Sequence, residues 1–130
     1  MAIRVVRLGS PRTGGEGLRL GTVRRPPRGV PKAEHASRDF YDVWLPDLAP
    51  TEALVKQALH ATDENAWKSF ARRYRAEMKR PEAARLLTLL AVLSHATDFS
   101  VGCYCAEEAR CHRSVLRELL RERGARIRPA

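Results

Sequence analysis

The chain has 130 residues, which suits a single domain over residues 1–130 and is too short for two independent cores. Lys and Arg number 24 against 15 Asp and Glu, a net charge of +9 at pH 7, and the basic excess lies in residues 1–38 and 110–130. No apolar run approaches the roughly 20 residues of a membrane-spanning helix. We therefore expect a cytoplasmic protein with no membrane partner.

The two basic ends point to a polyanion as partner. If they meet in the fold, they form one positive face suited to phosphate or to nucleic acid. The alternative is that the charge has no functional meaning, because most of the basic residues are arginine, a bias that a GC-rich genome or a heat-adapted host also produces. The candidate partners are a small anionic, phosphate-containing ligand and nucleic acid.

The first third of the chain predicts two strands and a rigid loop. Residues 3–8 alternate apolar and basic side chains and predict a strand, and residues 18–23 predict a second. Residues 24–31 are rich in proline and cannot form a helix, because proline lacks an N–H donor and biases the residue before it toward extended geometry. We expect a basic loop at the end of a strand. Residues 40–46 predict a short buried strand or an ordered connection.

Helices dominate the remainder. Helical spacing of apolar residues predicts helices over residues 51–59 and 64–79, a third from Pro81 to about residue 93, and a last one over 111–123. An apolar run at residues 99–104 predicts a strand before the last helix. An aromatic and methionine stripe on the second helix is more typical of a core than of a base-stacking platform. Its members are Trp67, Phe70, Tyr74 and Met78.

Few strands, several helices and a strand that leads directly into a helix favour an α/β fold. We expect a small single-layer sheet of few strands packed by about four helices. Ligands of such sheets collect at the carboxyl ends of the strands. Residues 24–28 and 103–113 both follow predicted strands, so the two segments converge if those strands are parallel neighbours.

All three cysteines of the chain lie within nine residues, at the junction of the strand 99–104 and the helix 111–123. The odd number and close spacing favour reduced thiols or a metal site over a secreted disulfide framework. The free N–H groups and dipole at such a helix start also favour an anion. The basic neighbours in this stretch are Arg110, His112 and Arg113.

One interpretation of the cluster is a metal site, because three thiols and an imidazole are the donor set of many structural zinc sites. The four donors would be Cys103, Cys105, Cys111 and His112. Their spacing argues against zinc, because structural sites usually separate two ligand pairs by a longer loop and adjacent Cys111 and His112 would need unusual directions. We therefore predict no cofactor and keep zinc as the alternative, with His35 or His95 as substitute ligands.

A second interpretation is a reactive thiol. Cys111 lies near a helix start beside positive charge, which favours the nucleophilic thiolate. No cysteine has an arginine at the spacing of the familiar phosphatase loop, which disfavours that chemistry. His112, Glu107 and Glu108 are candidate acid–base groups. Cys103 is expected to be a small buried hydrophobe.

A third interpretation is an anion site, which needs the fewest assumptions. The N–H groups of the helix start, the hydroxyl of Ser114 and the guanidinium of Arg113 would hold the anion. Arg24 and Arg28 would join them if the two segments converge, because arginine binds phosphate and carboxylate through paired hydrogen bonds.

Three motifs of the chain resemble the domain-of-unknown-function family numbered 488, which includes the YeaO-like proteins. The first runs from residues 17–20 into 24–30, the second is the helix segment 67–74, and the third joins 105–107 to 111–114. The resemblance implies an α/β fold and carries no settled activity. It implies as site candidates Arg24, Arg28, Cys105, Glu107, Cys111, His112 and Arg113.

Our hypothesis is a cytoplasmic protein with a Cys-His-Arg anion pocket that acts on a phosphorylated or nucleotide-like substrate. Cys111 or His112 would be the reactive group, and Arg24 and Arg113 would be the anion clamps. The alternative is a non-catalytic module that binds nucleic acid or is stabilised by a metal. Whether the protein is an enzyme stays open at this point.

Overall fold

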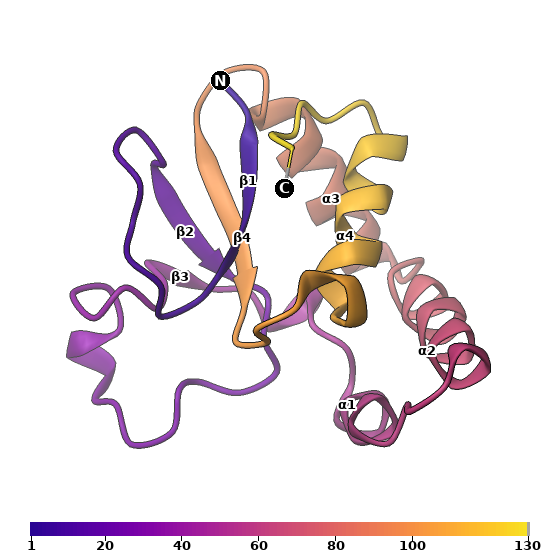
Figure 1. Ribbon diagram of the computed structural model, residues 1–130. Helices are drawn as coiled ribbons and strands as arrows, with labels where there is room; N and C mark the ends of the chain where they lie inside the picture. Colours follow the sequence, from indigo (N-terminus) through magenta and orange to yellow (C-terminus); the bar gives the residue numbers. More distant parts are fainter. Residues whose placement is uncertain (130) are drawn as a thin grey trace.

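The structure is a computed structural model that describes residues 1–129, and it contains one sheet of four parallel strands (Figure 1). The order across the sheet is β1-β4-β2-β3. The strands are β1 (Ile3–Arg7), β2 (Leu18–Gly21), β3 (Val43–Trp44) and β4 (Phe99–Cys103). β4 is last in the chain but lies between β1 and β2, so its carboxyl end is central in the sheet.

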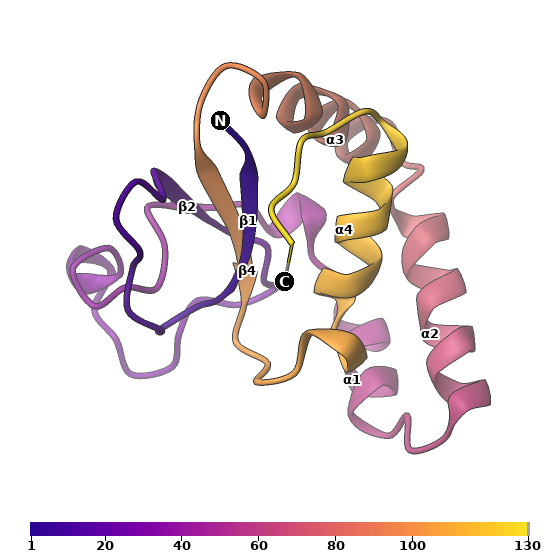
Figure 2. The same cartoon turned by 45° about the horizontal axis from the view of Figure 1, so that its top comes forward.

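Four α-helices stand on one side of the strands, while the connections 8–17 and 22–42 lie on the other (Figure 1, Figure 2). The helices are α1 (Glu52–Leu59), α2 (Glu64–Glu77), α3 (Pro81–Leu93) and α4 (His112–Glu122). Short 3-10 turns are η1 (Lys32–Glu34), η2 (Pro46–Leu48) and η3 (Glu108–Arg110). The predicted α/β fold, a single-layer sheet packed by about four helices, is confirmed.

Two helix starts follow local signals of the sequence. The side chain of Asp63 accepts a hydrogen bond from the N–H of Ala66 at 2.7 Å and so caps α2. Pro81 occupies the first turn of α3, where its missing N–H removes no helical bond. Both helices therefore begin close to the predicted positions.

The larger core lies between the sheet and the helices. Apolar side chains from β1, β2 and β4 pack there against all four helices. The stripe on α2 belongs to this core, as predicted, and the hydroxyl of buried Tyr74 donates to the carbonyl of Leu48 at 2.7 Å. Burying this apolar surface is the main stabilising contribution to such a fold.

A smaller apolar cluster lies at the carboxyl edge of the sheet. Its buried members are Leu8, Val23, Tyr41, Cys103 and Cys111. Two of the three cysteines thus lie inside a packed region, between the sheet edge and the connections that cover it.

The segment 40–46, predicted as a short buried strand or an ordered connection, contains only a very short and exposed strand. β3 contains only Val43 and Trp44, and each is 42% exposed. It pairs with β2 alone because it is the edge strand. The Pro-rich segment 24–31 contains neither helix nor strand, as predicted.

The end of the described chain returns to the first strand. Ile127 forms a parallel bridge with Ile3, with a bond of 2.9 Å from the N–H of Ile3 to the carbonyl of Arg126. Within residues 1–129 we find no helix with the length and apolar character to cross a membrane. That the whole chain is one domain stays a prediction.

Candidate functional site

The carboxyl ends of β2 and β4 form one side of a cleft of about 850 Å³. The strands are parallel neighbours in register, with Gly21 opposite Gly102, and the N–H of Thr22 donates to the carbonyl of Gly102 at 3.0 Å. The segments that follow β2 and β4 therefore begin side by side at the same edge of the sheet. In the cleft lining, residues 23–28 meet residues 103–105 and 110–112, so the predicted convergence of the two segments is confirmed.

Basic side chains surround the cleft. They are Arg24, Arg25, Arg28, Lys56 and Arg110, against the single acidic lining residue Glu52. Much of the remaining lining is apolar and comes from α1, α2 and the two loops: Pro26, Pro27, Phe40, Val55, Ala58, Leu59, Phe70 and Tyr104. The cleft thus combines positive charge with apolar surface, a composition that suits an organic anion.

The arginines of the cleft differ in how far their charge is already engaged. Arg24 donates through Nε and Nη2 to the carbonyls of Pro50 and Ala49 at 3.0 and 3.1 Å, which fixes the guanidinium without neutralising it. Arg25 pairs with Glu52.

Arg110 forms an ion pair with Glu64 at 3.1 Å and lies over the ring of Trp67. Arg28 and Lys56 are exposed and form no ion pair with any residue in the described part of the chain. These two charges are therefore available to a ligand.

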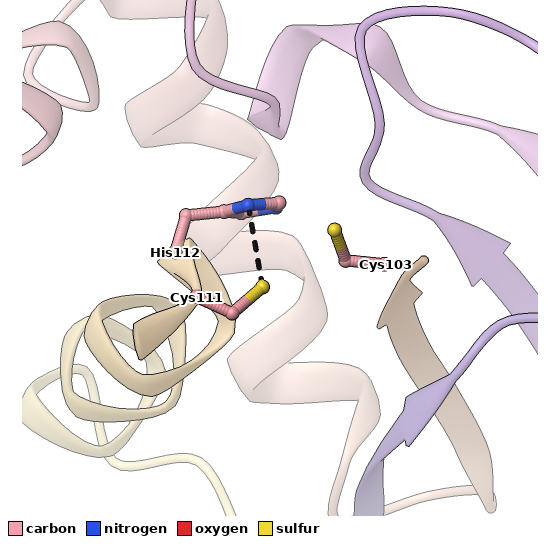
Figure 3. Close-up of side chains that lie close together, drawn as sticks. All are labelled: Cys103, Cys111 and His112. Atoms are coloured by element: carbon pink, nitrogen blue, oxygen red, sulfur yellow. Dashed lines mark hydrogen bonds between the residues drawn. The ribbon is translucent and has the colours of Figure 1, made fainter. Parts of the chain in front are cut away.

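A cluster of thiols and one imidazole forms part of the cleft lining (Figure 3). Cys103 ends β4, Cys111 is the N-cap of α4 and His112 is its first residue. All three are buried, and their potential ligand atoms lie within 4.8 Å of one another. The exposed Cys105 joins them, with its Sγ 3.7 Å from the Sγ of Cys103. We call these four residues the thiol–imidazole cluster.

The backbone fixes the orientation of His112. Its Nε2 lies 2.7 Å from the carbonyl oxygen of Thr22, and because a carbonyl only accepts, Nε2 must carry the proton. In neutral imidazole the lone pair is then on Nδ1, which lies 3.8 Å from the Sγ of Cys111. The ring also packs edge-on against Tyr74, with centroids 5.4 Å apart.

The pKa values of the three thiols are shifted in different directions. The hydrogen bonds to Cys105 and Cys111, together with burial, raise the pKa of Cys103 above its ordinary value. The hydrogen bond from Cys103 lowers the pKa of Cys105, and burial opposes this while Arg113 supports it. The pKa of Cys111 is also lowered, first by Cys103 and further by His112. The hydrogen bond from the Sγ of Cys103 to the Sγ of Cys105 therefore favours the thiol form of Cys103 and the thiolate form of Cys105.

Arg113 and Ser114 lie behind the cluster and do not line the cleft. Arg113 is 3% exposed, and its Nη2 and Nε donate to the carbonyl of Cys105 at 2.6 Å and to the Sγ of Cys111 at 3.4 Å. The hydroxyl of Ser114 donates to the carbonyl of Cys111 at 2.9 Å. Their anion-binding role stays a prediction.

The side chains of Glu107 and Glu108 have different surroundings. Glu107 is exposed and does not line the cleft, so its acid–base role stays a prediction. Glu108 accepts two hydrogen bonds from Arg117, at 2.6 and 2.9 Å, and so fixes η3 against α4.

His35 and His95 bond to the carbonyls of Val30 and Gly124 and belong to no group of potential ligands among residues 1–129.

Sequence reasoning missed Thr22 and the contribution of α1. Thr22 is a fully buried polar residue directly after β2, and a polar side chain at the end of an apolar strand was the available signal. Lys56 offered no such signal, because its position at the cleft depends on how α1 packs near the sheet edge.

Comparison with known proteins gives one match. A family model described as "Active DUF488-N3 subclade" matches residues 3–124. The comparison found no match among curated proteins or solved structures.

Proposed function

Because the chain belongs to the DUF488 family, matching the subclade described as active DUF488-N3, we propose that it acts on a phosphorylated or nucleotide-like small anion. The observation that carries this proposal is the composition of the cleft. Positive charges without acidic partners and the thiol–imidazole cluster line the same cavity.

The anion would bind to the basic side of the cleft. Arg28 and Lys56 are exposed and free to approach it, while Arg24 is held in place by two carbonyls. Charge-assisted hydrogen bonds from such groups to phosphate oxygens are stronger than neutral ones. The apolar lining from α1 and the loops supports an organic group on the anion, as in a nucleotide.

The reactive group would come from Cys111 and His112. Both line the cleft, and the Nδ1 of His112 lies beside the sulfur of Cys111. Soft sulfur and an imidazole lone pair bring either a nucleophile or a metal ligand to the bound anion. Three thiols without a disulfide support the cytoplasm as the proposed location.

A binding experiment tests the anion site. Calorimetric titration of the full reduced chain with adenosine, guanosine, cytidine and uridine monophosphates should show binding of at least one, tighter than binding of inorganic phosphate. Arg28→Ala should raise the Kd by about tenfold or more, because one charge-assisted bond is lost. The matched control is Arg85→Ala, since Arg85 is exposed on α3 outside the cleft.

The rival function predicts a different result. A nucleic-acid-binding module would bind single- or double-stranded oligonucleotides with steep salt dependence and lose little affinity per arginine. Binding of that kind, without binding of any mononucleotide, would refute the small-anion proposal. Loss of mononucleotide binding in both Arg28→Ala and Arg85→Ala would refute the cleft as its location.

A further inference from the structure

We propose that Cys103, Cys111 and His112 hold a thiophilic metal ion such as Zn²⁺, with the exposed Cys105 as a fourth, replaceable ligand on the cleft side. The inference concerns the cluster alone and would survive if the proposed anion substrate were wrong. Close spacing along the chain argued against a zinc site, but the geometry of Cys111 and His112 in the structure removes that objection.

The distances between donors match one tetrahedral ion. Sulfurs lying about 2.3 Å from a zinc ion at tetrahedral angles are separated by about 3.8 Å. The Sγ atoms of Cys103 and Cys105 lie 3.7 Å apart, and the Sγ of Cys111 lies 3.8 Å from the Nδ1 of His112. The ligand atoms of Cys103, Cys111 and His112 all fall within 4.8 Å of one another. These three atoms are close enough to share one ion, and the side chain of Cys105, which is outside this group, would have to move to complete the coordination.

A change of backbone direction allows the adjacent Cys111 and His112 to ligate together. Cys111 is extended, with φ −123° and ψ 151°, whereas His112 begins the helix α4. Their side chains therefore converge, and Figure 3 shows both directed toward the space that Cys103 also faces. The strand end supplies Cys103 and the helix start supplies the other two, so the ion would join β4 to α4.

The hydrogen bonds around the cluster are those that metal ligands usually have. A metal-bound histidine almost always donates its second ring N–H to a carbonyl or carboxylate. His112 does so, through Nε2 to the carbonyl of Thr22 at 2.7 Å, which leaves Nδ1 free for a metal. Arg113 donates an N–H to the Sγ of Cys111 at 3.4 Å.

Charge also favours a cation at this position. Binding a divalent ion displaces the protons of the thiols and leaves thiolates on the metal. Three thiolates on Zn²⁺ carry one excess negative charge, which the buried guanidinium of Arg113 balances. With Cys105 displaced, two thiolates and one imidazole leave an open position facing the basic cleft, and an open position is the feature of catalytic rather than structural zinc sites.

Metal analysis of the full chain tests the site. Protein purified and kept reduced should contain one zinc ion per chain in native mass spectrometry. After zinc removal and anaerobic loading with Co²⁺, it should show the intense visible bands of tetrahedral cobalt and sulfur-to-cobalt charge transfer. The control His95→Ala should behave as the parent, because His95 lies outside the cluster.

Three variants locate the ligands. Cys103→Ser and Cys111→Ser should each weaken zinc binding about tenfold or more, since each removes a fixed ligand. Cys105→Ser should keep the ion but lose the charge-transfer intensity of one thiolate in three. Circular dichroism checks that each variant is folded, and the exposed position of Cys105 keeps that variant informative if the buried ones unfold.

Two results would overturn the metal site. One is a parent chain that retains no zinc and leaves Co²⁺ with the pale spectrum of the hydrated ion. The other result combines two observations. The Co²⁺ spectrum of Cys105→Ser would be identical to that of the parent, and folded Cys103→Ser would bind zinc with unchanged affinity. Mononucleotide titration of the same samples separates this proposal from the proposed function, because Arg28→Ala should lose the anion while keeping the metal.

Discussion

Arg113 is buried against the sulfur atoms, and its position limits what it can do. Taking a guanidinium out of water is costly unless its donors find acceptors. Here the carbonyl of Cys105 and the Sγ of Cys111 accept from it. The side chain therefore holds the loop 104–110 against the start of α4. An external anion would have to replace these bonds to reach Arg113.

Replacing Arg113 tests this role. Arg113→Met should lower the free energy of unfolding by about 1–3 kcal/mol, because the carbonyl of Cys105 loses its donor. Urea unfolding measures the change. The control is Arg123→Met, because Arg123 is exposed at the C-cap of the same helix, α4. The folded variant should still bind mononucleotide. A variant as stable as the parent that no longer binds it would instead support Arg113 as an anion clamp.

At the scale of elements, the site depends on close packing between β2 and the connection that covers it. A Cβ on Gly21 would lie 2.3 Å from the Cδ2 of Tyr41 and 2.8 Å from its Cγ, so no side chain fits there. Tyr41 is buried in the same apolar cluster as Cys103 and Cys111. The absence of a side chain at Gly21 thus lets the connection close over the cysteines.

Gly21→Ala should therefore destabilise the protein by about 1–3 kcal/mol, the usual cost of overpacking a well-packed region. It should also increase the rate at which buried Cys111 reacts with a thiol reagent in the metal-free protein. Thermal unfolding and mass spectrometry of the labelled thiols measure the two effects. Gly14→Ala is the control, because a Cβ there meets no atom within 4 Å. Equal stability of the two variants would contradict this packing argument.

The elements could be predicted because they depend on local patterns, whereas the convergence of the two loops also required β2 and β4 to be parallel neighbours, which no local pattern determines. Pro81 and Asp63 mark helix starts, and apolar runs mark β2 and β4. The burial of Arg113 could not be predicted, because it depends on the path of the loop 104–110 over the start of α4. The thiol–imidazole geometry was missed for a similar reason. Spacing along the chain says little about distance once a helix start turns the backbone at Cys111.

At the scale of the whole molecule, two carboxylates hold the loop side of the sheet, that of buried Glu16 and that of Asp42 at the surface. Burial raises the pKa of Glu16, but bonds from Arg19, Thr13 and Ser100 outweigh burial and hold the pKa below its ordinary value. The pKa of Asp42 is lowered against burial in the same way, by Arg12 and by the backbone N–H of Arg19. Both groups join the connections 8–17 and 22–42 to β2.

Low pH should therefore destabilise the protein by weakening the attachment of the connections 8–17 and 22–42 to the sheet. A carboxylate with a lowered pKa stabilises the fold fully above its ordinary value, 4.5 for Glu16 and 3.8 for Asp42, and this stability is lost as pH falls through the lower pKa of the folded state. Urea unfolding between pH 7 and pH 3 should show a decline below these values. The decline should be shallower in Glu16→Gln than in exposed Glu82→Gln. Parallel curves for the two variants would contradict this assignment.

The bridge between Ile127 and Ile3 places residue 127 beside the start of the chain at the amino end of β1, while the cleft opens at the carboxyl ends of β2 and β4. A handle attached at the amino terminus would therefore lie at the end of the sheet opposite the cleft. Protein immobilised on a sensor surface through such a handle should present the cleft and its basic residues to the solution, so that small anions can be screened against a uniformly oriented layer.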